Sequence, residues 1–141
     1  MLNVGDQAPE IPGLVGFRGK RVVLYFYPKA DTPGCTLESC EFRDHAGEFE
    51  KKGAAVVGIS PDKPAAQEKF KTKYNLPFVL LSDDEKAAAQ AFGVWKEKTM
   101  YGRKVMGIER STFVIGPDGK IEKIYAKVKA AGHAAEVLNN L

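Results

Sequence analysis

Cysteine is scarce in this sequence, and the two that occur, Cys35 and Cys40, lie five positions apart. Two cysteines are too few for a disulfide-stapled scaffold or for a four-cysteine zinc site. The two histidines, His45 and His133, do not complete a zinc-binding pattern with them, because neither spacing matches one. We therefore expect no metal, and we place both histidines on helix surfaces.

Long apolar runs and a strong charge excess are lacking as well. No stretch approaches the ~20 apolar residues of a membrane span, and the amino terminus lacks the charged and apolar regions of a signal peptide. The net charge of +3 is small, with basic and acidic residues interspersed, which argues against a nucleic acid or a membrane as the partner. We expect a cytoplasmic protein, in a compartment where a static structural disulfide is unusual.

Neither internal repeats nor low-complexity linkers interrupt the chain, so we interpret residues 1–141 as a single domain. Buried strands are predicted at 22–27, where β-branched and aromatic residues run without polar alternation, and at 54–60. A short strand is predicted at 78–81. An antiparallel hairpin is predicted at 112–115 and 120–126, because Gly116-Pro117-Asp118-Gly119 between them is a turn signal.

Helix start and stop signals separate these strands and predict helices at about 33–51, 64–74, 84–92 and 131–141. Strands that alternate with helices and then end in a hairpin are typical of an α/β fold. We expect a mixed central β-sheet flanked by helices on both faces.

The segment from Pro28 to Cys40 carries the most informative chemistry. It follows the first buried strand, at the carboxyl end where α/β proteins usually place their sites, and Thr32-Pro33 is a helix-start signal. A cysteine one turn inside a helix start, as Cys35 is, lies where backbone N–H groups and the helix dipole favour thiolate over thiol. The sequence therefore predicts a nucleophilic sulfur at Cys35.

The spacing of Cys35 and Cys40 constrains how they can react. In one regular helix a five-residue step gives a Cα–Cα distance of about 8.6 Å, which exceeds the ~7 Å that a disulfide tolerates. The two sulfurs can bond only if the helix unwinds around them. This spacing suits a cysteine that a small molecule oxidises and a second thiol then resolves, although a core role for Cys40 stays open.

Several ordered motifs resemble a known family. Pro28-x-x-x-Thr32-x-x-Cys35 resembles the peroxiredoxin signature, and Asp31-Thr32-Pro33-Gly34-Cys35-Thr36 followed by Cys40 resembles the bacterioferritin comigratory (Q-type) subgroup. The similarity continues through Gly107-Ile108-Glu109-Arg110-Ser111-Thr112-Phe113 and Pro117-Asp118-Gly119, and it covers nearly the whole chain from Arg18 onward. One departure is a short segment after Gly5-Asp6-Gln7-Ala8-Pro9, where family members often carry a β-hairpin.

The resemblance implies a thioredoxin-like fold and the thiol-dependent reduction of hydrogen peroxide and organic hydroperoxides to water or alcohols. Cys35 matches the peroxidatic cysteine, which becomes a sulfenic acid, and Cys40 matches the resolving cysteine that closes an intramolecular disulfide. Pro28, Thr32 and Arg110 match the rest of the peroxide-binding constellation. Thioredoxin or a similar dithiol protein is the implied reductant, with no metal, flavin or haem. Because an internal disulfide needs no second chain, we expect a monomer.

The chemistry of these residue types agrees with those roles. Arg110 is a permanent cation whose planar donor fork can hold both a sulfur and a peroxide oxygen. Thr32 can offer its hydroxyl to the peroxide or cap the helix, and Pro28 can shield the sulfur from water.

Two other functions stay open. A thiol–disulfide oxidoreductase acting on proteins is possible on this fold, although it would favour a Cys-x-x-Cys spacing. A binding module with incidental cysteines is the third reading. Trp95, Met100 and Tyr101 either pack in the core or at a pocket rim, or form a docking surface for the reductant.

Overall fold

The computed structural model describes residues 2–141, with Met100 described by its backbone alone. Its centre is a five-stranded sheet in the order β3-β2-β1-β6-β7. These strands are β1 (Arg21–Phe26), β2 (Ala54–Ser60), β3 (Val79–Ser82), β6 (Ser111–Ile115) and β7 (Ile121–Tyr125). Strands β1, β2 and β3 run parallel, whereas β6 and β7 are antiparallel to their neighbours. The mixed sheet predicted from the sequence is confirmed.

Strand β1 occupies the middle of the sheet and is buried on both faces. Val23 and Tyr25 contribute to one core cluster, while Val22, Leu24 and Phe26 contribute to the other. Since successive side chains of a strand point to opposite faces, an unbroken apolar run can be buried only where both faces are covered. The sequence of β1 therefore accounts for its central position.

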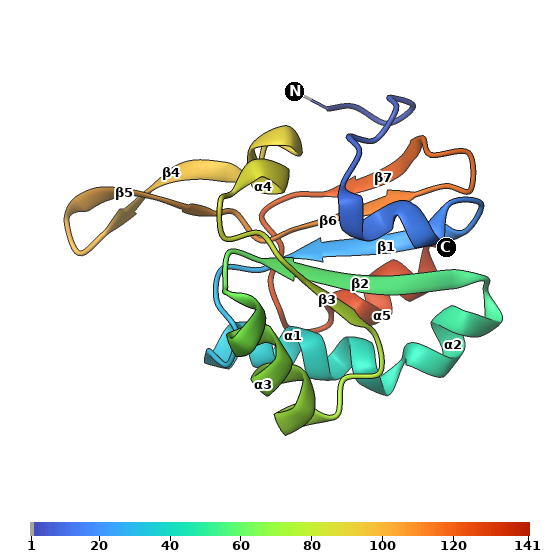
Figure 1. Cartoon of the computed structure of the whole chain (residues 1–141), viewed down its shortest axis with the longest axis horizontal. Helices are drawn as coiled ribbons and strands as arrows, with labels where there is room; N and C mark the ends of the chain where they lie inside the picture. The colour runs from blue at the N-terminus through green and yellow to red at the C-terminus, as the bar shows by residue number, and fades with distance from the viewer. Residues whose placement is uncertain (1) are drawn as a thin grey trace.

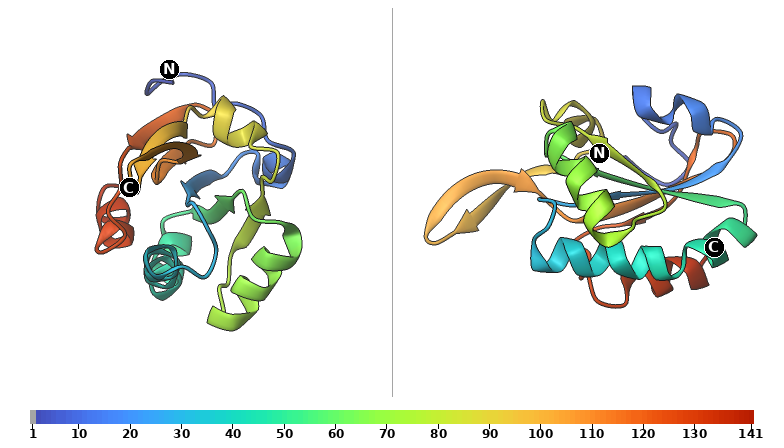
Figure 2. Two further views of the ribbon diagram at one scale, coloured as in Figure 1. Left: turned by 90° about the vertical axis from the view of Figure 1, so that its left-hand side faces the viewer. Right: turned by 60° about the horizontal axis from the view of Figure 1, so that its bottom comes forward.

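Helices cover both faces of the sheet (Figures 1 and 2). Phe42, Phe49, Phe70 and Val137 pack in the cluster on one face. They come from α1 (Pro33–Asp44), α2 (Ala46–Lys51), α3 (Pro64–Tyr74) and α5 (His133–Asn139). The 3-10 helix η1 (Pro12–Phe17) and α4 (Ala87–Ala91) border the cluster on the other face. The predicted helical layers are confirmed.

The helix expected over about 33–51 is interrupted at His45, whose backbone ψ of 6° leaves the helical region. The carbonyl of His45 then accepts the backbone N–H groups of Glu48 and Phe49 and starts α2. The rings of Phe42 and Phe49, seven residues apart, meet at 5.7 Å. A straight helix would separate these residues by about 10 Å along its axis, so the bend serves core packing.

His133 is buried, and the prediction that it lies on a helix surface is wrong. Its ring packs edge-on against Phe42 and Tyr125, and its Nε2 lies 2.7 Å from Thr112 Oγ1. Burial lowers the pKa of His133, even though Glu136 opposes that shift. The residue begins α5, and its ring lies between Phe42 of α1 and Tyr125 of β7.

A second, two-stranded sheet was not predicted from the sequence. Strands β4 (Trp95–Met100) and β5 (Arg103–Ile108) form a hairpin that projects from the body of the molecule (Figure 1). Both Tyr101 and Gly102 have positive φ, as a tight hairpin turn requires. Tyr101 is 98% exposed, so it does not belong to the core. Trp95 is partly buried and packs against the core. The prediction for Met100 concerns its side chain, which lies outside the described part of the structure.

The amino-terminal chain joins the sheet by only a single bridge, between Gln7 and Lys120. Its backbone exchanges hydrogen bonds with Gly119 and Ile121 before η1 begins. Residues 2–20 thus form no hairpin, in keeping with their short length. Within the described chain, no helix has the length and apolar character needed to cross a membrane.

Candidate active site

The first turn of α1 positions Cys35. Pro33 occupies the first helical position after Thr32, where its missing N–H group costs nothing. The first intrahelical hydrogen bond runs from the N–H of Thr36 to the carbonyl of Thr32, at 2.8 Å. The N–H groups of Gly34 and Cys35 precede that bond and therefore have no acceptor in the helix. Cys35 is 1% exposed, so its sulfur lies in a shielded, electropositive place.

Arg110 reaches this sulfur from the segment between β5 and β6. Its Nη2 lies 3.3 Å from Cys35 Sγ, and its Nη1 donates to Glu38 Oε1 at 2.7 Å. The guanidinium also lies against Gly34, where a Cβ atom would stand 3.1 Å from Nη2. A single planar cation thus contacts three residues of the first turns of α1.

Glu38 is a site residue that the sequence analysis missed. Its side chain is completely buried, and Oε2 has no hydrogen-bond partner among the described residues. Burial raises the pKa of Glu38 to about 7, against the opposing effect of Arg110. Its position one helical turn after Cys35 was the available signal, because residues three apart share a helix face.

The Arg110 guanidinium supplies a positive charge beside the Cys35 sulfur. Burial alone would lower the pKa of Arg110, but Glu38 and Cys35 together raise it, so the guanidinium keeps its charge. Because burial also raises the pKa of Glu38, this carboxyl neutralises the cation less completely than an ordinary glutamate would.

The other predicted site residues lie on the same segment. The Thr32 hydroxyl donates to the Lys29 carbonyl at 2.7 Å and makes no capping bond to the helix. Pro28 follows β1 after Tyr27 and is half-buried. Cys40 is half-buried further along α1, and both cysteines are free thiols. The structure is therefore that of the reduced chain, with both cysteines in one intact helix.

Neighbouring elements hold the loop that precedes α1. Asp31 has a positive φ and accepts hydrogen bonds from Lys73 Nζ at 2.9 Å and from the Tyr74 hydroxyl at 2.7 Å. The backbone N–H of Ala30 donates to Asp62 Oδ2 at 2.7 Å. Contacts with α3 and with the end of β2 thus fix the approach to Cys35.

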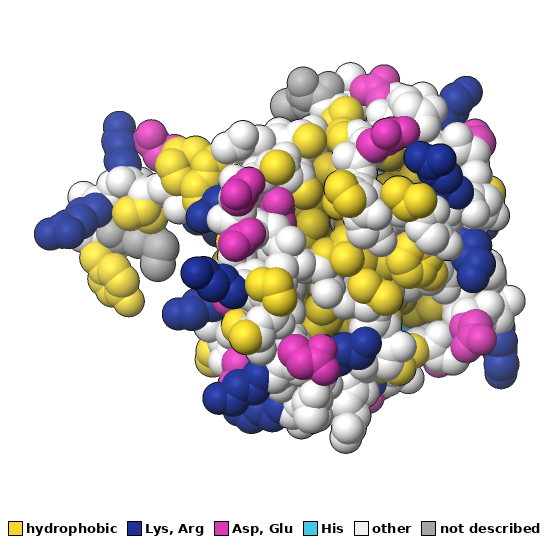
Figure 3. Space-filling view, viewed as in Figure 1, with side chains coloured by type: hydrophobic (Ala, Val, Ile, Leu, Met, Phe, Trp, Pro, Cys, Tyr) yellow, Lys and Arg dark blue, Asp and Glu magenta, His cyan; other side chains and the backbone are white. Residues whose placement is uncertain are grey.

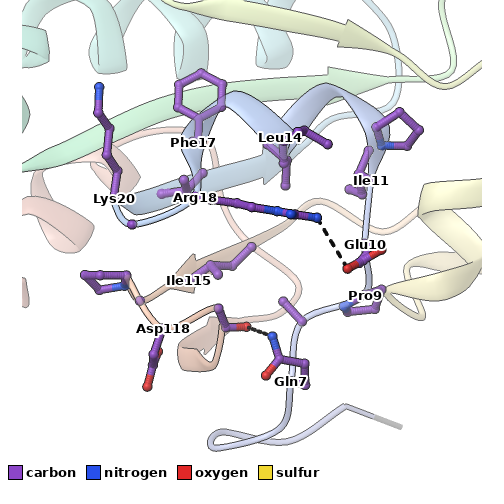
Figure 4. A pocket seen from close by; sticks show the side chains of 18 residues that line it. Gln7, Pro9, Glu10, Ile11, Leu14, Phe17, Arg18, Lys20, Ile115 and Asp118 are labelled. Atoms are coloured by element: carbon purple, nitrogen blue, oxygen red, sulfur yellow. Dashed lines mark hydrogen bonds and ion pairs between the residues drawn. The ribbon is translucent and has the colours of Figure 1, made fainter.

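A separate cavity lies away from Cys35. It encloses about 650 Å³ between η1 and the turn that joins β6 to β7 (Figure 4). Apolar side chains such as Ile11, Leu14 and Phe17 line it, and none of the predicted site residues does. This cavity is therefore separate from the predicted site at the start of α1.

The model of the AhpC/TSA family matches residues 4–124. Peroxiredoxin Bcp of Bacillus subtilis (strain 168) is 48% identical over 149 aligned residues, which cover 99% of this chain and 95% of that protein. This chain belongs to the AhpC/TSA family, among its Bcp or Q-type peroxiredoxins. The alignment is longer than the 141 residues of this chain, so this peroxiredoxin lacks some residues that its relative has.

Solved structures agree with this peroxiredoxin assignment. A Cys-to-Ser mutant of Xylella fastidiosa PrxQ superposes with a TM-score of 0.91 at 39% identity, covering 99% of this chain and 95% of that one. Xanthomonas campestris bacterioferritin comigratory protein gives a TM-score of 0.86 at 45% identity, covering 90% of this chain and 81% of that one. Its structure is described in terms of alkyl peroxide reduction. The thioredoxin-like fold and the family resemblance are both confirmed.

Proposed function

We propose that this protein is a thiol-dependent peroxidase that reduces hydrogen peroxide and organic hydroperoxides through Cys35. One observation carries the proposal: a buried sulfur at a helix start lies 3.3 Å from a guanidinium nitrogen. A cation and free N–H groups there stabilise the thiolate, which is the nucleophilic form of cysteine. The alkyl peroxide reduction named for the Xanthomonas relative supports organic hydroperoxides as substrates.

In the first step the Cys35 thiolate attacks one oxygen of the peroxide. A sulfur–oxygen bond forms, the oxygen–oxygen bond breaks, and the departing oxygen takes up a proton to leave as water or an alcohol. Arg110 has further N–H protons beside the sulfur with which to hold the peroxide as charge develops on the leaving oxygen. Thr32 and Pro28 border the approach, the first with a hydroxyl and the second as an apolar shield.

In the second step Cys40 resolves the sulfenic acid. Its thiol attacks the Cys35 sulfur, a disulfide forms and water leaves. Both cysteines lie in α1, and a five-residue helical step holds their Cα atoms too far apart for a bond. Part of α1 therefore unwinds before the disulfide closes, and a dithiol protein such as thioredoxin then reduces it.

The intramolecular disulfide makes a second chain unnecessary, so we propose a monomer of one domain. Thioredoxin-type reductants and two free thiols fit a cytoplasmic location, where disulfides form only transiently.

The test is stopped-flow mixing of the reduced protein with hydrogen peroxide or cumene hydroperoxide, followed by Trp95 fluorescence and a thiol count. The wild type should lose both thiols with one equivalent of peroxide. Cys40→Ser should form one sulfenic acid per chain, trapped by dimedone, and then stall in turnover with thioredoxin. Cys35→Ser should not react.

Two results would contradict the proposal. Normal steady-state turnover of Cys40→Ser would mean that another thiol resolves Cys35. A wild type that reduces insulin disulfides but leaves peroxide untouched would be a thiol–disulfide oxidoreductase instead.

A further inference from the structure

The β4–β5 hairpin carries a net positive charge. The chain as a whole has a formal charge of +3. Residues 95–108 hold four basic residues and one acidic residue, which also gives +3. The remainder of the chain is therefore neutral in sum, and basic side chains are visible on the projecting hairpin (Figure 3).

The strand register divides this charge between the two faces of the hairpin. Lys98 pairs with Val105 and Lys96 pairs with Gly107, so these side chains share one face, and Arg103 shares it by the two-residue alternation. Its three cations define what we call the basic face. The opposite face carries Glu97 and Lys104, which form an ion pair at 3.8 Å and cancel.

One cation of the basic face, Lys98, extends toward the base of the hairpin, where the chain continues to Arg110. The Lys98 stem lies over Gly107 and its Nζ donates to the Ile108 carbonyl, two residues before Arg110. Burial and the charge of Arg110 lower the pKa of Lys98. The hairpin and the first turn of α1 also lie at the same end of the molecule in Figure 1 and in the right-hand view of Figure 2.

Exposed apolar side chains accompany these charges. Tyr101 at the hairpin tip is 98% exposed, and Val105 on the basic face is exposed as well. On α1, Leu37 lies between the two cysteines and is 46% exposed. Apolar anchors surrounded by charges are typical of a surface that binds another protein.

We propose that the basic face of the β4–β5 hairpin, together with Tyr101 and Leu37, is the docking surface for the dithiol reductant. The partner is a protein that carries acidic residues around an exposed apolar patch and its reactive thiol. Seated on this face, it would present that thiol to the Cys35–Cys40 disulfide in α1. The inference rests on the proposed peroxidase function and specifies the recognition of its second substrate.

Charge argues against a second copy of this chain as the occupant. In a two-fold dimer the same patch meets itself, so two basic faces would oppose each other. Lys96 is paired with Glu109 at 2.9 Å, whereas Arg103 makes no ion pair within the described residues and is free to meet an acidic partner.

The test compares Arg103→Glu with Lys104→Glu. These neighbours change the net charge equally but lie on opposite faces of the hairpin. Turnover is measured with hydrogen peroxide and either thioredoxin or the small neutral dithiol dithiothreitol as the reductant. Arg103→Glu should lower kcat/KM for thioredoxin about tenfold at low ionic strength. Lys104→Glu should lose less than about threefold, and both variants should match the wild type with dithiothreitol.

Raising the salt concentration supplies a second measurement. The wild-type kcat/KM for thioredoxin should fall as salt screens the charges, and that of Arg103→Glu should change little. Equal losses in the two variants, no loss in Arg103→Glu, or no turnover with thioredoxin while dithiothreitol supports it would overturn the docking proposal. A dimer seen by light scattering and abolished by Arg103→Glu would assign the face to a second copy and overturn it too.

Failure of the peroxidase proposal is distinguishable from these outcomes. In that case the single-turnover reaction of Cys35 with peroxide is absent before any reductant is added. The docking proposal concerns only the reduction that follows.

Discussion

At the scale of single residues, the Arg110 guanidinium is the connection between the sulfur and its surroundings. Its two terminal nitrogens divide between Cys35 and Glu38, at 3.3 and 2.7 Å. Lysine carries the same charge but only as a point charge. A lysine ammonium could therefore contact the sulfur or the buried carboxylate, but not both in the planar arrangement that arginine allows.

Arg110→Lys should accordingly slow the oxidation of Cys35 by hydrogen peroxide about 10²- to 10³-fold, the range for loss of a preorganised donor. Stopped-flow single turnovers measure the rate, and circular dichroism checks that the fold persists. Arg103→Lys makes the same exchange outside the site and should keep the wild-type rate. A comparable rate in the two variants would remove Arg110 from the mechanism.

Glu38 gives the stability of the protein a definite pH dependence. Its pKa in the folded chain is about 7, raised by burial from an ordinary value of 4.5. The folded state therefore holds a proton that the unfolded state releases at lower pH, so stability falls as pH rises from about 4.5 to about 7. The full shift corresponds to about 3 kcal/mol.

Glu38→Gln should remove this decline. Urea unfolding at pH 5 and pH 8 measures the free energy of unfolding, and the variant should gain about 3 kcal/mol on the wild type between the two. His133 acts in the opposite direction, because its lowered pKa costs stability as pH falls, but it contributes equally to both proteins. The exposed control Glu50→Gln should follow the wild type. An unchanged pH profile in Glu38→Gln would contradict the assignment.

At the scale of the helix, the first turn of α1 has to be narrow as well as electropositive. Gly34 and Gly47 each occupy the second position of a helix, α1 and α2 respectively. A Cβ on Gly34 would stand 3.1 Å from Arg110 Nη2, whereas a Cβ on Gly47 would have nothing within 4 Å. The two glycines therefore offer a matched comparison.

Gly34→Ala should displace the guanidinium and lower the peroxide reaction rate about tenfold or more, because a small misplacement of a catalytic donor is costly. Gly47→Ala should keep the rate and stabilise the protein by up to about 1 kcal/mol, the gain for alanine over glycine in a helix. Stopped-flow kinetics and urea unfolding of both variants provide the measurements. If Gly34→Ala retains the wild-type rate, the close approach of Arg110 to Gly34 is not needed for the reaction with peroxide.

The sequence predicted regular elements well where apolar patterns and helix signals coincide. The bounds of β2 and α3 match the predicted ranges, and Thr32-Pro33 correctly marked the start of α1. The break at His45 was not predictable, because it depends on ring packing between Phe42 and Phe49 in the folded core. The β4–β5 hairpin was missed because most of its side chains face solvent and give no apolar pattern.

The site residues could likewise be predicted where local sequence was enough, and not where contacts between distant parts of the chain decide. Cys35 and Thr32 could be placed at a helix start from neighbouring residues alone. Arg110 is 75 residues away from Cys35 in the chain, and only the family resemblance linked the two. Glu38 needed the structure, because a glutamate in the first turns of a helix ordinarily faces water and favours the helix dipole.

At the scale of the whole molecule, both cysteines lie in α1, so the internal disulfide that we propose needs no second chain. We expect light scattering to give 15.4 kDa, the mass of one chain. The yield of internal disulfide after one equivalent of peroxide should not change over a hundredfold range of protein concentration. A yield that rises with concentration would show that the disulfide forms between chains.

The carboxyl terminus lies at the opposite end of the molecule from the β4–β5 hairpin (Figure 1). Lys52 and Lys123 donate to the carbonyls of Leu138 and Asn140, which fixes the last turn of α5 against the body. A flexible tether attached after Leu141 could therefore anchor the enzyme to an electrode or a bead with its reactive sulfur facing the solution. Attachment through the lysines of the hairpin would instead turn that sulfur toward the support.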